Sequence, residues 1–117
     1  MPDGSEALDG SCHCGAVRLR VASLPTDLND CQCEHCQKRG ALWAYYALDE
    51  VSVSGPTSVY IWGDREIEFH FCSACGCTTH WAPIDRRYNR MGLNARVLGK
   101  AVFQTVPIRK GAGPTGS

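Results

Sequence analysis

The sequence predicts a mostly β protein. Apolar and polar residues alternate in several short segments, and a period of two is typical of strands that bury one face. Turn-forming residues separate these segments, as at Ser54-Gly55-Pro56 and Gly63-Asp64. Only two short stretches have a helical character, and both are too short to form stable helices without metal or tertiary packing.

The first predicted strand, Ala16–Val21, reads AVRLRV and begins directly after a cysteine-containing turn. Further strands are predicted, in chain order, at Leu42–Leu48, Val51–Ser54, Ser58–Trp62 and Glu66–Phe71. The two predicted helical turns are Glu34–Arg39 and Pro83–Tyr88.

Length and composition indicate one domain over residues 1–117, with flexible ends at about 1–9 and 110–117. Apolar residues make up 44% of the chain, and 12 basic residues balance 12 acidic ones. This balance gives no bulk attraction to nucleic acid. Neither a signal peptide nor a membrane span is apparent, so we expect a cytoplasmic protein with no membrane partner. The oligomeric state is not predicted.

Eight cysteines in 117 residues indicate metal binding, a disulfide framework, or scattered buried thiols. A disulfide framework needs an oxidising compartment, and no export signal points to one. Cysteines two or three positions apart direct several sulfurs toward one ion, whereas a disulfide across such a short loop is strained. The spacing therefore favours metal. The cysteines lie in three groups: Cys12 and Cys14; Cys31, Cys33 and Cys36; and Cys72, Cys75 and Cys77.

Tetrahedral thiolate coordination is typical of zinc, and four sulfurs close a structural site. Eight cysteines allow two closed sites, but the partition need not be even. The central group offers three thiolates and leaves a fourth position for water or substrate, which is typical of a catalytic zinc. The outer C-x-C and C-x-x-C pairs then form a structural site. Cys77 completes the second site, remains a free nucleophile, or is a small buried residue.

Six motifs extend over most of the chain: GSCHCGAV at 10–17, CQCEHC at 31–36, GALWAYY at 40–46, YIWGD at 60–64, FCSACGCTTHW at 71–81 and RMGLNAR at 90–96. With these motifs the chain resembles a compact branch of the glutathione-dependent formaldehyde-activating enzyme (GFA) family, to which centromere protein V is related. The resemblance implies an Mss4-like fold of antiparallel sheets and two zinc ions per chain. It places Cys12, Cys14, Cys72 and Cys75 on the structural zinc and Cys31, Cys33 and Cys36 on the second.

The resemblance also implies a carbon-sulfur lyase that is similar to S-(hydroxymethyl)glutathione synthase. Its substrates are a small thiol such as glutathione and a small aldehyde such as formaldehyde. A soft three-thiolate zinc is suited to holding a substrate thiol as thiolate, the form that attacks an aldehyde carbon. Candidate donors to the resulting alkoxide are Asn94, Arg96 and His80. Arg96 also belongs to a group that can bind a substrate carboxylate, with Arg86, Arg87 and Arg90.

Two rival interpretations use the same residues. In the first, both metals only stabilise the fold, and the domain is a non-enzymatic zinc-binding module for protein or nucleic-acid interaction, although the neutral charge argues against nucleic acid. In the second, Cys33, His35, Cys77 and His80 hold a Rieske-like iron-sulfur cluster. His35 is also a candidate fourth ligand of the central zinc.

Overall fold

The computed structural model describes residues 7–63 and 65–111, and their regular structure is mostly β, as predicted. The strands of this part are β1 (Leu8–Ser11), β2 (Arg18–Val21), β3 (Leu28–Cys31), β4 (Trp43–Tyr46), β5 (Val51–Ser54), β6 (Thr57–Tyr60), β7 (Ile67–Cys72), β8 (Thr78–Pro83), β9 (Met91–Asn94) and β10 (Ile108–Gly111). The helices are α1 (Glu34–Arg39) and α2 (Lys100–Phe103), with 3-10 turns η1 (Leu48–Glu50) and η2 (Ala95–Leu98). None of the helices in the described ranges is long and apolar enough to cross a membrane.

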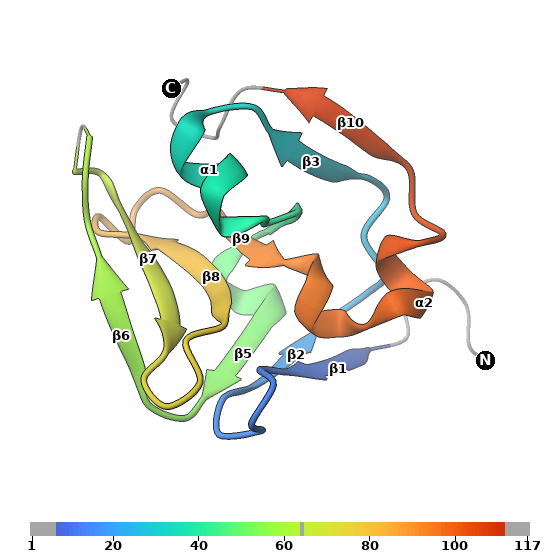
Figure 1. Ribbon diagram of the computed structural model, residues 1–117, viewed down its shortest axis with the longest axis horizontal. Coiled ribbons are helices and arrows are strands. Elements are labelled where there is room, and N and C mark those ends of the chain that lie inside the picture. Colours follow the sequence, from blue (N-terminus) through green and yellow to red (C-terminus); the bar gives the residue numbers. More distant parts are fainter. Residues whose placement is uncertain (1–6, 64, 112–117) are drawn as a thin grey trace.

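The strands form two sheets. The smaller sheet has the order β1-β2-β5, and the larger has the order β10-β3-β4-β9-β8-β7-β6. Every strand pair is antiparallel except β10 with β3. The β6–β7 hairpin lies on one side of the molecule and the β3–β10 pair on the other, with α1 beside β3 (Figure 1). The prediction of antiparallel sheets thus holds apart from this one edge.

Each predicted strand is present, with its ends shifted by a few residues, and β5 has the predicted bounds. The predicted helical turn Glu34–Arg39 is α1 itself. The second predicted helical turn, Pro83–Tyr88, is wrong, because Pro83 ends β8 and pairs with Ile67. The residues after it form a turn closed by Tyr88 N donating to Asp85 O at 3.0 Å.

Five strands were not predicted: β1, β3, β8, β9 and β10. Every residue of β8 is buried, so its sequence TTHWAP has no alternation between an apolar and a polar face. The outermost strands also reach into the expected flexible ends, since Leu8 and Asp9 belong to β1 and Lys110 and Gly111 to β10. The rest of those ends, residues 1–6 and 112–117, lies outside the described ranges.

Helix α1 is held by its caps rather than by its length. The Cys33 sulfur accepts a hydrogen bond from Cys36 N at 3.4 Å at the first turn. Gly40 ends the helix in the left-handed conformation, with φ 67°, and its N–H donates to the Cys36 carbonyl. The cysteine motif therefore defines the helix as well as a possible metal site.

The core has two parts, and both contain cysteines. Cys12 and Cys72 belong to the larger part, with Leu28 and Leu93 among their neighbours. Cys31 and Cys36 belong to the smaller part, which is rich in aromatic side chains, namely Trp43, Phe69 and Trp81. Gly92 on β9 lets the Trp81 indole pack against the sheet, because a Cβ there would lie 2.0 Å from its Nε1.

Candidate metal centres

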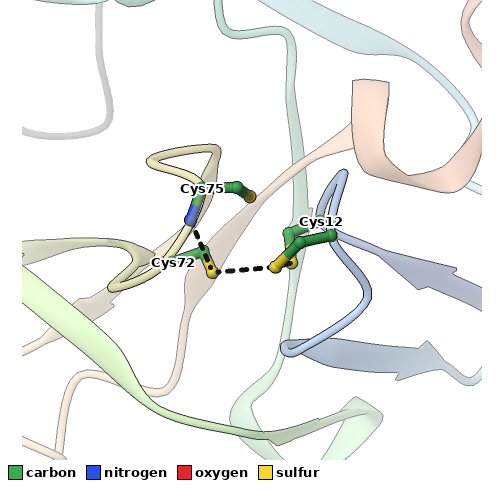
Figure 2. A group of neighbouring side chains, drawn as sticks. Cys12, Cys72 and Cys75 are labelled. Carbon is green, nitrogen blue, oxygen red and sulfur yellow. Dashed lines mark hydrogen bonds between the residues drawn. The ribbon is translucent and has the colours of Figure 1, made fainter.

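The first candidate metal centre joins two loops that are distant in sequence. Cys12 and Cys14 lie in the loop between β1 and β2, and Cys72 and Cys75 lie where β7 turns toward β8. All four sulfurs are within 4.8 Å of one another. Figure 2 shows the Cys12, Cys72 and Cys75 side chains brought together from the two loops. These loops belong to different sheets, so the cluster connects the two sheets.

The sulfur spacing fits a tetrahedral ion. Sulfurs about 2.3 Å from a central zinc lie about 3.8 Å apart. Cys14 Sγ is 3.7 Å from both Cys12 Sγ and Cys72 Sγ. Backbone N–H groups also point at the sulfurs, with Val17 N 3.3 Å from Cys12 Sγ and Ala74 N 3.3 Å from Cys72 Sγ. Such donors stabilise thiolates, the form that binds metal.

The thiols of this cluster differ in acidity. Backbone N–H donors from Cys77 and Cys14 lower the pKa of Cys75 to about 5. The pKa of Cys14 is raised to about 11, because hydrogen bonds with the thiols of Cys72 and Cys12 outweigh the lowering by the Ala16 N–H. Four thiols this close cannot all ionise without a cation to balance them. The cluster is therefore suited to a metal ion.

The second candidate metal centre is built from one short segment. Cys31 ends β3, Cys33 caps α1 and Cys36 lies in its first turn, and the three sulfurs are within 4.8 Å of one another. Trp43 Nε1 donates to Cys36 Sγ at 3.3 Å. Cys31 and Cys36 are buried, whereas Cys33 is half-buried. Solvent therefore reaches this cluster from the side of Cys33.

The cysteines gather in one group of four and one group of three, the grouping that the sequence predicts for two metal sites, and all eight are free of disulfides. Cys77 is a neighbour of the four-cysteine cluster but is not within its set of ligand atoms. His35 and His80 are in neither cluster, and Cys33 and Cys77 are not grouped together. This arrangement contradicts the Rieske-like interpretation, which requires those four side chains around one centre.

The predicted donor His80 lies away from the three-cysteine cluster. It pairs with His70 across β7 and β8, and their rings stack at 4.3 Å. The next residue, Trp81, packs in the core part that contains Cys31, and alternation along a strand directs His80 to the other face. Burial, with His70 and Arg86 nearby, lowers the pKa of His80 to about 3. His80 Nδ1 lies 2.8 Å from Thr79 Oγ1, and this contact favours a structural role.

The predicted donors Asn94 and Arg96 lie near the C-terminal end of α1. The Asn94 amide is occupied by backbone groups, because Nδ2 donates to Thr78 O at 2.8 Å and Oδ1 accepts from Leu42 N at 3.3 Å. Arg96 is exposed, and its Nε donates to Gly40 O at 2.7 Å. Both residues line one cleft, together with residues from the loops of the four-cysteine cluster.

The structure adds two donors that sequence reasoning missed. Arg39 Nε donates to His35 Nε2 at 2.7 Å, so the proton of neutral His35 is on Nδ1. His35 Nδ1 is buried and has no hydrogen-bond partner, and the same is true of Trp62 Nε1 and of Trp81 Nε1, which packs against Gly92. The rings of His35 and Trp62 are 5.1 Å apart. Burial, and secondarily Arg39, lowers the pKa of His35 to about 4, which keeps the ring neutral at pH 7.

Buried donors without an acceptor are rare and cost about 1–3 kcal/mol each. His35 lies between two cysteines of the second cluster, and Trp62 packs against the core part that contains Cys31 and Cys36. An acceptor bound between the two rings would satisfy both N–H groups. In the sequence, the position of His35 within CQCEHC was the one signal for a role of this residue at the site. Nothing in YIWGD indicated a role for Trp62.

The ligand set of the four-cysteine cluster predicts opposite results for two neighbouring cysteines. Cys75→Ser removes a ligand, and the protein should lose one metal per chain and its cooperative unfolding transition, because metal binding contributes directly to folding. Cys77→Ser should keep the wild-type metal content and unfolding temperature. Elemental analysis and thermal unfolding followed by circular dichroism measure both. Loss of metal in Cys77→Ser would show that the ligand set is wrong.

Comparisons with known proteins agree with this arrangement. Residues 7–107 match the family model described as "Glutathione-dependent formaldehyde-activating enzyme". A Halomonas elongata protein, provisionally named a glutathione-dependent formaldehyde-activating enzyme, is 41% identical over 83 residues, which is 58% of this chain and 51% of that protein. The chain thus spans about half the length of this relative.

A crystal structure of a Rhodobacter sphaeroides protein has the same fold, with a TM-score of 0.72 and 30% identity, and the match covers 87% of this chain and 100% of that one. The family match includes both cysteine clusters and most of the strands. The chain therefore belongs to the glutathione-dependent formaldehyde-activating enzyme family.

Proposed function

We propose that this protein is a carbon-sulfur lyase that forms and cleaves the adduct between a small thiol and a small aldehyde. Glutathione and formaldehyde are the substrates that the family name suggests. One observation carries the proposal: the second cluster supplies three thiols to one position, while the first supplies four. A structural ion is closed by four protein ligands, whereas a reactive one keeps a position for substrate.

Zinc is the ion we propose for both clusters, since tetrahedral thiolate sets are typical of it. Bound at the three-cysteine cluster, zinc supplies a soft Lewis acid that keeps a thiol ionised at neutral pH. The chain contributes the ligands and their surroundings. Trp43 Nε1 donates to Cys36 Sγ, and the burial of Cys31 and Cys36 restricts access to the side of Cys33. The location we propose is the cytoplasm, where thiols stay reduced.

In the proposed reaction the sulfur of the substrate thiolate attacks the aldehyde carbon, and the carbonyl electrons move to oxygen. The alkoxide then takes up the proton that the thiol released, so the reaction needs no oxidant or reductant. The reverse reaction breaks the same C–S bond. The chain must therefore stabilise a developing negative charge on one oxygen.

We propose the N–H groups of His35 and Trp62 as donors to that oxygen. Both are buried and unpartnered, so no existing hydrogen bond must break when they bind an acceptor. Donors that are already oriented stabilise a transition state without the cost of reorganisation. Arg39 acts as a positioning residue, because its bond to His35 Nε2 leaves the His35 proton on Nδ1. Arg96 and Asn94 remain candidate donors, and both line the cleft near the C-terminal end of α1. His80 is the weakest of the predicted donors.

Cys33→Ser tests the proposed activity while leaving the helix intact, because serine is also a strong N-cap residue. The variant should lose the acceleration of S-hydroxymethyl adduct exchange, measured by NMR with ¹³C-labelled formaldehyde and glutathione. Gln32→Ala is the matched control, since Gln32 lies between two ligands and bonds only to Asp30 O through its side chain. Wild-type exchange rates in a folded Cys33→Ser variant would contradict the proposal.

Trp62→Phe tests the donor assignment, because it removes the indole N–H and keeps an aromatic ring. Loss of one donor of this kind typically lowers kcat about 100-fold, and metal content should not change. Tyr60→Phe is the control, because the Tyr60 ring also stacks on His35, with ring centroids 5.6 Å apart, but Tyr60 has no buried N–H group. Equal kcat values for both variants and the wild type would exclude Trp62 as a donor.

A further inference from the structure

A cleft of about 560 Å³ lies between the loops of the four-cysteine cluster and the C-terminal end of α1. One wall comes from the loops of the four-cysteine cluster and includes His13 and Cys77. The opposite wall comes from the end of α1, with Arg39 and Gly40, and from η2, with Arg96. The residues of this cleft within the described ranges include two arginines and a histidine but no aspartate or glutamate.

The charge of this cleft is a local property. The whole chain is neutral, with 12 basic and 12 acidic residues. A second hollow of similar size, about 550 Å³, is lined by Arg65 but also by Glu66 and Asp85. Within residues 7–63 and 65–111, the ion pairs do not include Arg39 or Arg96. The two guanidinium groups therefore stand beside one concave surface and form no ion pair with a carboxylate of the described residues.

Both guanidinium groups are held in place by neutral acceptors. Arg39 Nε donates to His35 Nε2, and its Nη1 donates to Thr78 Oγ1 at 2.9 Å. Arg96 donates to Gly40 O through Nε, and its guanidinium carbon lies 5.2 Å from the centre of the Phe103 ring. A guanidinium has five N–H donors, so each group keeps donors for an oxygen anion. Because both guanidinium groups are already held in place, binding an oxygen anion costs less conformational entropy.

We propose that this cleft binds a carboxylate group of the substrate thiol, an inference that rests on the proposed function. Gly40 follows Cys36 by four residues along α1, a distance of about 6 Å at 1.5 Å per helical residue. In an extended peptide each residue spans roughly 3.5 Å. A tripeptide thiol is therefore long enough to have its sulfur at the three-cysteine cluster and a terminal carboxylate in the cleft.

The cleft also connects substrate binding with the proposed donor. Arg39 is shared, since it lines the cleft and bonds to His35 Nε2. Of the four arginines that the sequence suggested for a carboxylate, only Arg96 lines this cleft. Arg87 is paired with Asp85 at 2.7 Å, and Arg90 lies over Tyr45 at 4.3 Å. Arg39, which was not in that group, takes the second position.

The test is binding of S-methylglutathione to the zinc-loaded full chain, measured by isothermal titration calorimetry. This probe has both carboxylates but no free thiol. Arg96→Gln should weaken its binding at least tenfold, and Arg90→Gln should leave it unchanged. Arg90 is the matched control because it is also exposed and stacked on an aromatic ring, but it lines a different hollow that contains Glu50. Circular dichroism and metal content verify that each variant is folded.

A second ligand makes the assignment specific to carboxylate. The diethyl ester of S-methylglutathione should bind the wild type as weakly as the acid binds Arg96→Gln, and Arg96→Gln should not weaken the ester further. Equal affinity of wild type and Arg96→Gln for the acid, an equal loss in Arg90→Gln, or no binding to the wild type would overturn the proposal. Arg96-dependent binding without adduct exchange would instead contradict the proposed function and leave the cleft as a carboxylate site.

Discussion

The convergence of four thiols from two loops is the constraint on which the rest of the structure depends. Cys14 and Cys72 are 58 residues apart, yet their sulfurs lie 3.7 Å from each other. One loop belongs to the three-stranded sheet and the other to the seven-stranded sheet. An ion bound between them has no complete site until both sheets have formed, so its binding energy stabilises the whole fold. Short strands and helices of six residues or fewer need such a connection.

The three-cysteine cluster has a different relation to the fold. Its three cysteines lie within six residues, and hydrogen bonds at Cys33 and Gly40 already define the helix that contains Cys36 and is capped by Cys33. A metal there adds little to the connection of distant strands, which leaves its coordination available for chemistry. The features around it are those of a binding site, since buried N–H groups of His35 and Trp62 lack acceptors and Arg39 leads to a cationic cleft. The proposed function thus assigns a structural role to the four-cysteine cluster and chemistry to the three-cysteine cluster.

The sequence predicted those features that are encoded locally. Alternation identified β2 and β5, cysteine spacing indicated the two groups, and the short helical stretch Glu34–Arg39 is α1. Strand β8 was missed because both of its faces are buried, and β10 because its exposed residues pair in parallel with β3 far away in sequence. The unpartnered N–H groups and the cleft depend on tertiary contacts, so no spacing rule could have revealed them.

Metal content per chain tests the division of roles most directly. Elemental analysis should find two zinc ions in the wild type and one in the triple variant Cys31→Ser, Cys33→Ser, Cys36→Ser. The triple variant should keep its β-rich circular dichroism spectrum and a cooperative unfolding transition, because the four-cysteine cluster still connects the sheets. An unfolded triple variant would contradict the account and favour a zinc module in which both sites only stabilise the fold, whereas unchanged metal content would contradict it by showing that the three-cysteine cluster holds no metal.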